Sequence, residues 1–276
     1  MPKTILVLLD GCTFQAATEN LGYMEHLVEA CAAAKYRVRG ELPSSSRPMY
    51  ETLLTGLPVL AHGIWNNLTV RRSKCENIFS LCRKNGLTTA AAAYSWMSEL
   101  YVRAPFDPMR DRFLDDEQSA IQHGIFYFED DYPDSHVFAD AAYLLGRHNP
   151  DFLLIHSMNI DDTGHAHTAA SPQYAAAAAK ANILLSMLLP DLIAAGYSVI
   201  VLADHGMNAY GLHGGNTTEQ RETALYLVAP KSRRGNFARQ PISQLCVAPL
   251  ICKCLGISPS GEMRTLEELE AGFFEE

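Results

Sequence analysis

The sequence lacks the features that mark several classes of protein. It has no low-complexity tract and no visible internal repeat, so disorder is expected only at the ends. The first residues, MPKTILVLLDG, have neither the longer apolar stretch nor the small-residue cleavage site of a secretory signal. No segment reads as an apolar membrane span. We therefore expect a protein without a secretory signal and without contact with a membrane.

Positive charge and disulfide-forming cysteine are also scarce. There are 22 Lys and Arg against 31 Asp and Glu, for a net charge of −9, which argues against a general nucleic-acid-binding surface. The seven cysteines are an odd number and are scattered along the chain, unlike a disulfide framework. A cytoplasmic location is therefore expected. Cys252 and Cys254 lie in an apolar run, where core packing is favoured over zinc binding.

Four short apolar runs have the pattern of buried strands, and helical patterns lie between them. The runs are TILVLLD, DFLLIHS, YSVIVLADH and ALYLVAP. Helices are expected at 20–34, 74–85, 135–148, 172–195 and 242–255. This alternation predicts an α/β doubly wound sandwich, with a central, mostly parallel sheet flanked by helices.

The length of the chain fits one catalytic domain over residues 1–276. Residues 96–134 have no clean periodicity and carry many acidic residues. We expect this stretch to leave the core sheet, either as an excursion that covers the site or as a solvated surface loop.

Acidic residues and histidines gather where the expected strands end, which is the edge of an α/β sheet where ligands bind. Carboxylate oxygens and imidazole nitrogens are common zinc ligands, and a four-residue spacing lets one helical turn aim two side chains at one ion. Each residue alone also fits a cap, a turn or a core histidine, but their common edge favours a metal site. The residues are Asp10, Asp161, His165, Asp204, His205 and His213.

A hydroxyl nucleophile is available in LPSSSRPMYETLLTG. Ser44, Ser45 and Ser46 precede Pro48, which suits the first turn of the helix that the following residues predict. A serine at a helix N-terminus lies among free backbone N–H groups that favour a phosphate. The alternative is an ordinary serine N-cap, and these residues alone do not choose between the three serines.

These segments resemble, in this order and over most of the chain, the alkaline phosphatase superfamily and specifically its type I phosphodiesterase/nucleotide pyrophosphatase family. The matching motifs are VLLDG, SRPMYETLLTGLPVLAHGIWNN, DDTGH and DHGM. The resemblance places the nucleophile at Ser46 and a phosphate-contacting amide at Asn67, with the backbone N–H of Arg47 as a second donor. The GLHGG segment resembles branches related to glycolipid phosphoethanolamine transferases, which nominates His213 as a ligand.

The resemblance implies two divalent metal ions, with zinc expected and manganese or iron as alternatives. One ion would be held by Asp10, Ser46, Asp204 and His205. The other would be held by Asp161, His165 and His213. His62 is expected to be structural, and His167 to support a ligand or face solvent in preference to contacting substrate. Arg71, Arg72 and Lys74 fit either a solvated face or a second phosphate.

The implied function is a two-metal hydrolase that acts on a small-molecule phosphate ester or phosphonate through a phosphoserine, most simply a phosphodiesterase or nucleotide pyrophosphatase. A phosphomonoesterase, a phosphonate hydrolase of the phosphonoacetate hydrolase kind and a phosphotransferase share the chemistry and stay open. A metal-dependent binding protein is the alternative without catalysis. Tyr50 stands where sulfatases of the superfamily need an arginine, which argues against sulfatase activity.

Overall fold

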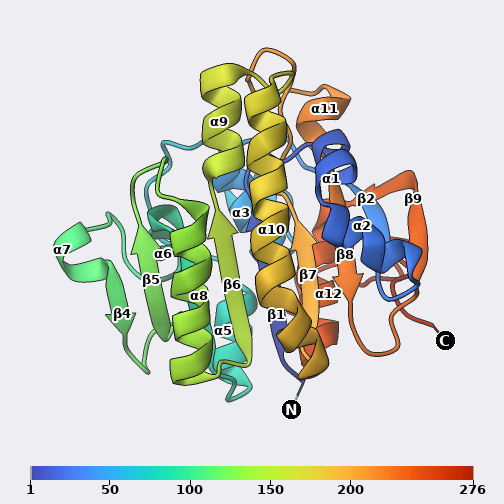
Figure 1. Cartoon of the computed structure of the whole chain (residues 1–276). Helices are drawn as coiled ribbons and strands as arrows, with labels where there is room; N and C mark the ends of the chain where they lie inside the picture. The colour runs from blue at the N-terminus through green and yellow to red at the C-terminus, as the bar shows by residue number, and fades with distance from the viewer. Residues whose placement is uncertain (1, 276) are drawn as a thin grey trace.

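A mixed sheet of nine strands runs through the middle of the computed structural model, which describes residues 2–275 (Figure 1). The strand order is β4-β5-β3-β6-β1-β7-β8-β2-β9. The strands are β1 (Thr4–Leu9), β2 (Ala34–Arg39), β3 (Thr89–Tyr94), β4 (Phe113–Asp115), β5 (His123–Tyr127), β6 (Phe152–Ser157), β7 (Ser198–Leu202), β8 (Glu222–Val228) and β9 (Gly235–Ser243). Among these strands five of the eight pairings are parallel, so the predicted α/β sandwich with a mostly parallel sheet is confirmed.

Helices cover both faces of the sheet (Figure 1). The front layer holds α1 (Phe14–Asn20), α2 (Gly22–Glu29), α8 (Asp134–His148) and α10 (Pro172–Ala194), and the rear layer holds α3 (Ser46–Thr55), α5 (Ile78–Lys84), α6 (Ser95–Tyr101) and α12 (Val247–Leu255). The shorter helices are α4 (Val59–His62), α7 (Pro108–Asp111), α9 (Asn159–His167), α11 (Thr218–Arg221) and the 3-10 turn Gln244–Cys246.

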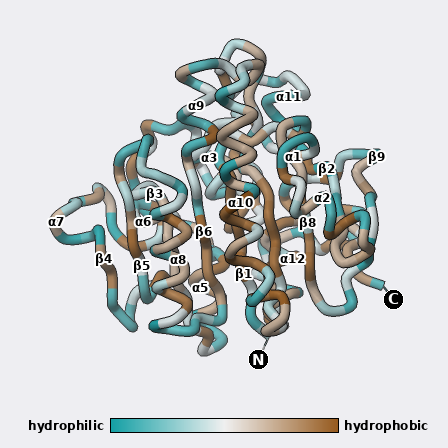
Figure 2. The backbone as a smooth tube through the Cα atoms, in the orientation of Figure 1, coloured by the Kyte–Doolittle hydropathy of each residue, from teal (hydrophilic) through white to brown (hydrophobic). Residues whose placement is uncertain are grey.

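The apolar runs form the centre of the sheet because both of their faces are covered. In β1, Leu6 and Leu8 pack into the core beneath the rear helices, while Val7 and Leu9 pack into the core beneath the front helices. A strand buried on both sides has to be apolar at every position, not at alternate ones. Figure 2 shows this as hydrophobic colour along the central strands.

Residues 96–134 do not form one continuous loop. They contain most of α6, then α7, and then β4 and β5, which extend the sheet beyond β3. β5 is buried along its whole length, so this part of the stretch belongs to the core. Whether the rest covers a substrate stays a prediction.

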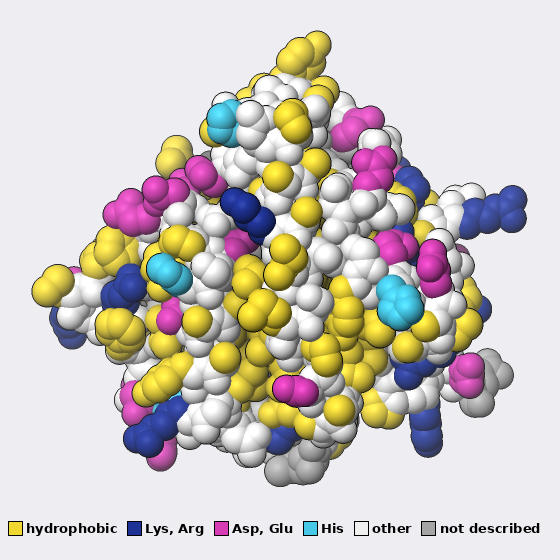
Figure 3. Space-filling view, in the orientation of Figure 1, with side chains coloured by type: hydrophobic (Ala, Val, Ile, Leu, Met, Phe, Trp, Pro, Cys, Tyr) yellow, Lys and Arg dark blue, Asp and Glu magenta, His cyan; other side chains and the backbone are white. Residues whose placement is uncertain are grey.

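Helix α10 is, by length and composition alone, long and apolar enough to cross a membrane, contrary to the expectation that no segment is. In the structure it lies along the front of the sheet with Ala178, Ala181 and Leu185 buried. Its outer face exposes Ile183 and Met187, and Figure 3 shows hydrophobic side chains on this side of the molecule with charged ones between them. The expected absence of membrane contact stays a prediction.

The adjacent strands β6, β1 and β7 are parallel, and Leu8 of β1 pairs with His156 of β6 and with Leu202 of β7. Their carboxyl ends are therefore level with one another. The chain leaves this edge at Asp10, through α9 and through the loop that follows β7. The fold thus brings three segments that are distant in sequence to one place.

Candidate active site

The edge formed by β1, β6 and β7 carries both groups of predicted metal ligands. Asp10 directly follows β1, Asp161 and His165 lie on α9 after β6, and Asp204 and His205 follow β7. Each predicted group offers ligand atoms that lie within 4.8 Å of one another. The structure therefore brings together the residues that the sequence nominated, while their binding of metal stays a prediction.

The first group surrounds the imidazole of His205, which is fully buried. Its Nε2 lies 3.1 Å from Ser46 Oγ, 3.2 Å from Asp204 Oδ2 and 3.5 Å from Asp10 Oδ1. Ser46 is itself buried, and it begins α3, so its hydroxyl lies at the positive end of the helix dipole. The predicted nucleophile therefore faces the same point as the three predicted ligands.

The second group lies beside the first and is more open. His165 Nε2 lies 3.2 Å from Asp161 Oδ2 and 3.1 Å from His213 Nε2, and His213 Nε2 lies 3.9 Å from Asp161 Oδ1. The rings of His213 and His205 stack with their centroids 4.0 Å apart, which places the two groups next to each other. The side chain of His165 is 44% exposed, so this group can be reached from solvent.

Backbone carbonyls orient two of the histidines. His205 Nδ1 lies 2.9 Å from the carbonyl oxygen of Gly206, and His165 Nδ1 lies 2.8 Å from that of Gly211. A carbonyl oxygen only accepts hydrogen bonds, so Nδ1 carries the proton in both rings. Nε2 of each ring therefore points toward the carboxylates, and it is the nitrogen through which the neutral ring would bind a metal ion.

Three buried carboxylates lie at this edge, and their like charges repel one another. Burial and the nearby charges of Asp10 and Asp161 raise the pKa of Asp204 well above its ordinary value. Burial and the charge of Asp10 likewise raise the pKa of Asp161. Burial acts in the same direction on Asp10, but the His156 hydrogen bond and the charges of His205 and His156 outweigh it and lower its pKa to about 2.

Each of these carboxylates keeps one oxygen without a hydrogen-bond partner: Asp10 Oδ1, Asp161 Oδ1 and Asp204 Oδ2. Buried polar atoms are rarely left unpaired, because desolvation is costly without a compensating bond. Oxygens and imidazole nitrogens converging in this way fit divalent cations such as Zn²⁺. The donor set therefore fits the two implied metal ions.

The two groups that were predicted to contact the phosphate, the Arg47 backbone N–H and the Asn67 side chain, are hydrogen-bonded to each other. The backbone N–H of Arg47 donates to Asn67 Oδ1 at 3.0 Å. This bond orients the Asn67 amide and leaves its Nδ2 free to donate to a phosphate oxygen. The Arg47 N–H could donate to a phosphate oxygen only by sharing or breaking its hydrogen bond to Asn67. The Arg47 side chain pairs with Glu99 at 2.7 Å and stacks on Trp96.

The sequence reasoning missed the residues that hold Asp10. Its Oδ2 accepts hydrogen bonds from Tyr50 Oη and from His156 Nε2, the latter at 3.0 Å. His156 Nδ1 accepts the backbone N–H of Tyr94 at 3.4 Å, so Nε2 carries the proton. Burial and the charge of Asp10 raise the pKa of Tyr50 well above its ordinary value, so its hydroxyl stays protonated. The sequence feature that could have pointed to His156 is the presence of a histidine inside the apolar run DFLLIHS.

Two glycines allow the segments to approach closely. Gly11 has φ +68°, and a Cβ there would lie 2.5 Å from Asp161 Oδ1. Gly214, in the HGG segment, has φ +93°, and a Cβ there would lie 2.9 Å from Ser45 Oγ. The Gly214 N–H also donates to the Ser44 carbonyl at 2.8 Å, which ties the His213 loop to the nucleophile loop. Both positions need glycine.

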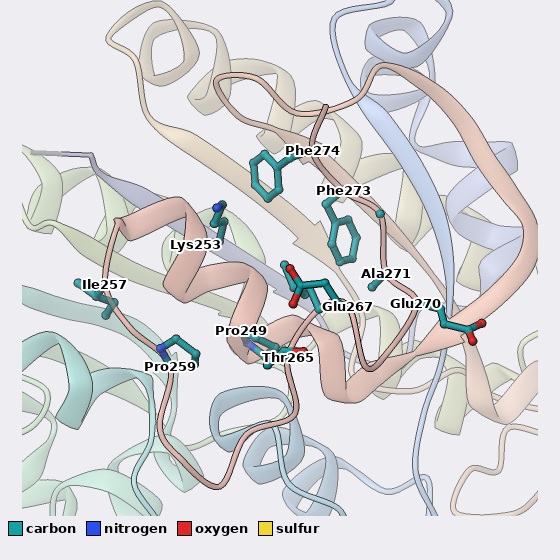
Figure 4. A pocket seen from close by; sticks show the side chains of 12 residues that line it. Pro249, Lys253, Ile257, Pro259, Thr265, Glu267, Glu270, Ala271, Phe273 and Phe274 are labelled. Atoms are coloured by element: carbon teal, nitrogen blue, oxygen red, sulfur yellow. The ribbon is translucent and has the colours of Figure 1, made fainter. Parts of the chain in front are cut away.

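The remaining sequence candidates lie outside these groups. His62 is buried, with its Nε2 3.0 Å from Thr52 Oγ1, and burial followed by the charge of Arg71 lowers its pKa to about 4. Arg71 donates to the carbonyls of His62 and Gly63, while His167 is exposed. A hollow of about 600 Å³ between α12 and the C-terminal segment is lined by none of the predicted site residues (Figure 4).

Neutralising Asp204 tests whether the carboxylates need cations. A carboxyl group whose pKa is raised on folding costs stability that grows as the pH rises above its unfolded pKa and toward its folded one. We therefore expect Asp204→Asn to raise the melting temperature of the chelator-treated protein at pH 8 by about 3 °C. The variant should also lose the part of the zinc-induced rise that comes from the ion held by Asp10, Asp204 and His205. Asp162→Asn, next to Asp161, should keep the zinc response, and an equal response in Asp204→Asn would contradict the metal assignment.

His156→Gln tests the support of Asp10. Losing a hydrogen bond that orients a ligand should weaken metal affinity about 10- to 100-fold, and Tyr50→Phe should act in the same direction. Competition with a chromogenic chelator measures the affinity. Activity regained at raised zinc concentration would separate lost orientation from general damage. Wild-type affinity in both variants would show that Asp10 needs no such support.

Comparison with solved structures supports the fold. The murine ectonucleotide pyrophosphatase/phosphodiesterase 5 superposes with a TM-score of 0.78 at 12% identity, covering 99% of this chain and 100% of that one. A phosphonate monoester hydrolase from Silicibacter pomeroyi has a TM-score of 0.68 at 14% identity, covering 100% of this chain and 78% of that one. At these identities the likeness concerns the fold alone.

Curated relatives are similar to this chain over part of their length. The catalytic subunit of GPI ethanolamine phosphate transferase 2 from Homo sapiens is 22% identical over 278 residues, which covers 92% of this chain but 26% of the relative. The GPI ethanolamine phosphate transferase 2 of Schizosaccharomyces pombe is 29% identical over 136 residues, covering 42% of this chain and 18% of the relative. The chain thus spans about a quarter or less of these proteins.

A family model supports the resemblance read from the motifs. The model described as type I phosphodiesterase / nucleotide pyrophosphatase matches residues 4–217, which include both ligand groups, Ser46 and Asn67. This match covers most of the chain. The chain therefore belongs to the type I phosphodiesterase/nucleotide pyrophosphatase family.

Proposed function

We propose that this chain hydrolyses phosphodiesters through a covalent phosphoserine at Ser46, with two divalent metal ions, most simply zinc. The observation that carries the proposal is the placement of two buried carboxylates, Asp10 and Asp204, each with an unpartnered oxygen, around the histidine that Ser46 Oγ faces, with the unpartnered oxygen of Asp161 in the neighbouring group. Family membership and the phosphodiesterase fold agree with phosphoester chemistry. When bound, the metal ions would supply positive charge for the attacking, leaving and non-bridging oxygens.

The residues of the chain would each contribute to one part of the reaction. Ser46 Oγ attacks phosphorus, the bond from phosphorus to the leaving oxygen breaks, and a phosphoserine ester forms. Asn67 Nδ2 donates to a non-bridging oxygen as charge gathers there. Water then attacks phosphorus from the opposite side and releases Ser46. Two successive displacements leave the configuration at phosphorus unchanged.

Charge at the nucleophile favours a diester over a monoester. Arg47 is the cation next to Ser46 in sequence, but its guanidinium is buried and paired with Glu99. It is therefore not free to neutralise the additional negative charge of a monoester. A diester carries one charge on its two non-bridging oxygens, which suits a site with few free cationic side chains.

Ser46→Ala tests the nucleophile. We expect it to lower the hydrolysis of bis-p-nitrophenyl phosphate by at least about 10³-fold, because the covalent route is lost. Ser45→Ala is the matched control, since Ser45 makes no side-chain capping bond, and it should keep most of the activity. Mass spectrometry of acid-quenched wild type should find a p-nitrophenyl phosphoryl group on Ser46. Full activity in Ser46→Ala would overturn the mechanism, and faster turnover of p-nitrophenyl phosphate than of the diester would overturn the diester preference.

A phosphotransferase is the second candidate, favoured by the GPI ethanolamine phosphate transferases among the curated relatives. It would share the first displacement and differ in the acceptor, an alcohol in place of water. With the p-nitrophenyl ester of phosphoethanolamine as donor and glycerol as acceptor, a transferase should form glycerol phosphoethanolamine in excess of phosphoethanolamine. Phosphorus NMR measures the ratio of the two products. A ratio that only follows the molar ratio of glycerol to water would indicate a hydrolase.

A further inference from the structure

A third cluster of side chains that could hold a metal ion lies at the opposite end of the sheet's strands from the active site. It consists of Asp115 at the end of β4, His123 at the start of β5 and His148 in the last turn of α8. In Figure 1 β5 begins and α8 ends at the lower edge of the sheet, while α9 lies at the upper edge. Along β5 the two edges are on the order of 15 Å apart. The cluster is therefore separate from the predicted catalytic ligands.

The three side chains already face one another. Asp115 and His123 are opposite in the antiparallel pairing of β4 with β5, and Asp115 Oδ1 lies 2.7 Å from His123 Nδ1. The ring of His148 stacks on that of His123, with centroids 3.7 Å apart and an interplanar angle of 15°. One ligand atom from each residue lies within 4.8 Å of the other two.

A cross-strand hydrogen bond explains the pair of Asp115 and His123, but it does not explain His148. The ring of His148 instead lies against that of His123, within reach of the same point as the Asp115 carboxylate. His148 also lies at the C-terminus of a 15-residue helix, where the dipole favours a cation. Two imidazoles and a carboxylate form a common set of protein ligands for zinc.

We propose that Asp115, His123 and His148 bind a Zn²⁺ ion, with water as the fourth ligand. Tetrahedral zinc holds neighbouring ligand atoms about 3.3 Å apart, so the atoms need to move by about 1 Å or less. An ion lies near the plane of each imidazole that it binds, so the stacked rings must tilt apart on binding. The ion would tie β4, the short edge strand of the sheet, to the end of α8.

Zinc stoichiometry tests the site directly. The whole chain is loaded with ZnCl₂, desalted and measured for zinc per chain by plasma mass spectrometry. His148→Ala and Asp115→Asn should each bind one ion fewer than the wild type, whatever number the active site holds. His136→Ala removes an exposed histidine of the same helix and should match the wild type. Equal zinc content in all four proteins would overturn the proposal.

A second measurement separates this site from the active site. In the double variant Asp161→Asn, Asp204→Asn, which lacks a ligand of each catalytic group, Zn²⁺ at about a hundred times its dissociation constant should still raise the melting temperature by about 5 °C. Adding Asp115→Asn should abolish that rise; because this carboxylate is 76% exposed, the change should not prevent folding. No rise in the double variant would overturn the site and leave the proposed function untouched.

Discussion

Three negative charges buried at one edge of a sheet are the constraint on which the rest of the site depends. Asp10, Asp161 and Asp204 follow three adjacent strands, and burial together with their mutual repulsion raises the pKa of Asp161 and of Asp204. Such an arrangement costs stability unless cations compensate it. The carboxylates stay together despite this loss of stability because β1, β6 and β7 are buried on both faces. Their ends cannot move apart without opening the core on both sides of the sheet.

The surroundings of these charges are arranged so that each ligand presents one defined atom. Peptide carbonyls set the Nε2 atoms of His165 and His205 toward the carboxylates. Tyr50 and His156 both donate to Oδ2 of Asp10, which leaves Oδ1 toward the site. These donors and acceptors add no further negative charge to a region that already holds three carboxylates. The buried polar network thus specifies orientation, while the cations that it fits would supply the stability.

The central strands and the ligand residues were predictable because apolar runs ending in acids are visible locally in the sequence. β3 was not, since its sequence, TAAAAY, favours a helix by intrinsic propensity and becomes a strand through its neighbours β5 and β6. The support of Asp10 by His156 could not be predicted because it depends on strand register and on a contact 146 positions apart in the chain. The stacking of Arg47 on Trp96 and its pairing with Glu99 likewise depend on how α6 packs against α3.

The two ligand groups differ in their access to solvent, and this difference bears on the choice between hydrolysis and transfer. Asp10, Asp204 and His205 are fully buried around the nucleophile, whereas the group of Asp161 opens to solvent at His165. In an in-line displacement the leaving group departs opposite the nucleophile, and the acceptor later enters from the same side. Under the proposed mechanism, the nucleophile would act from the buried group, whereas the acceptor would enter at the group that is open to solvent. Under the same mechanism, what covers that group, whether water, residues of this chain or a further part of a longer protein, would decide which oxygen receives the phosphoryl group.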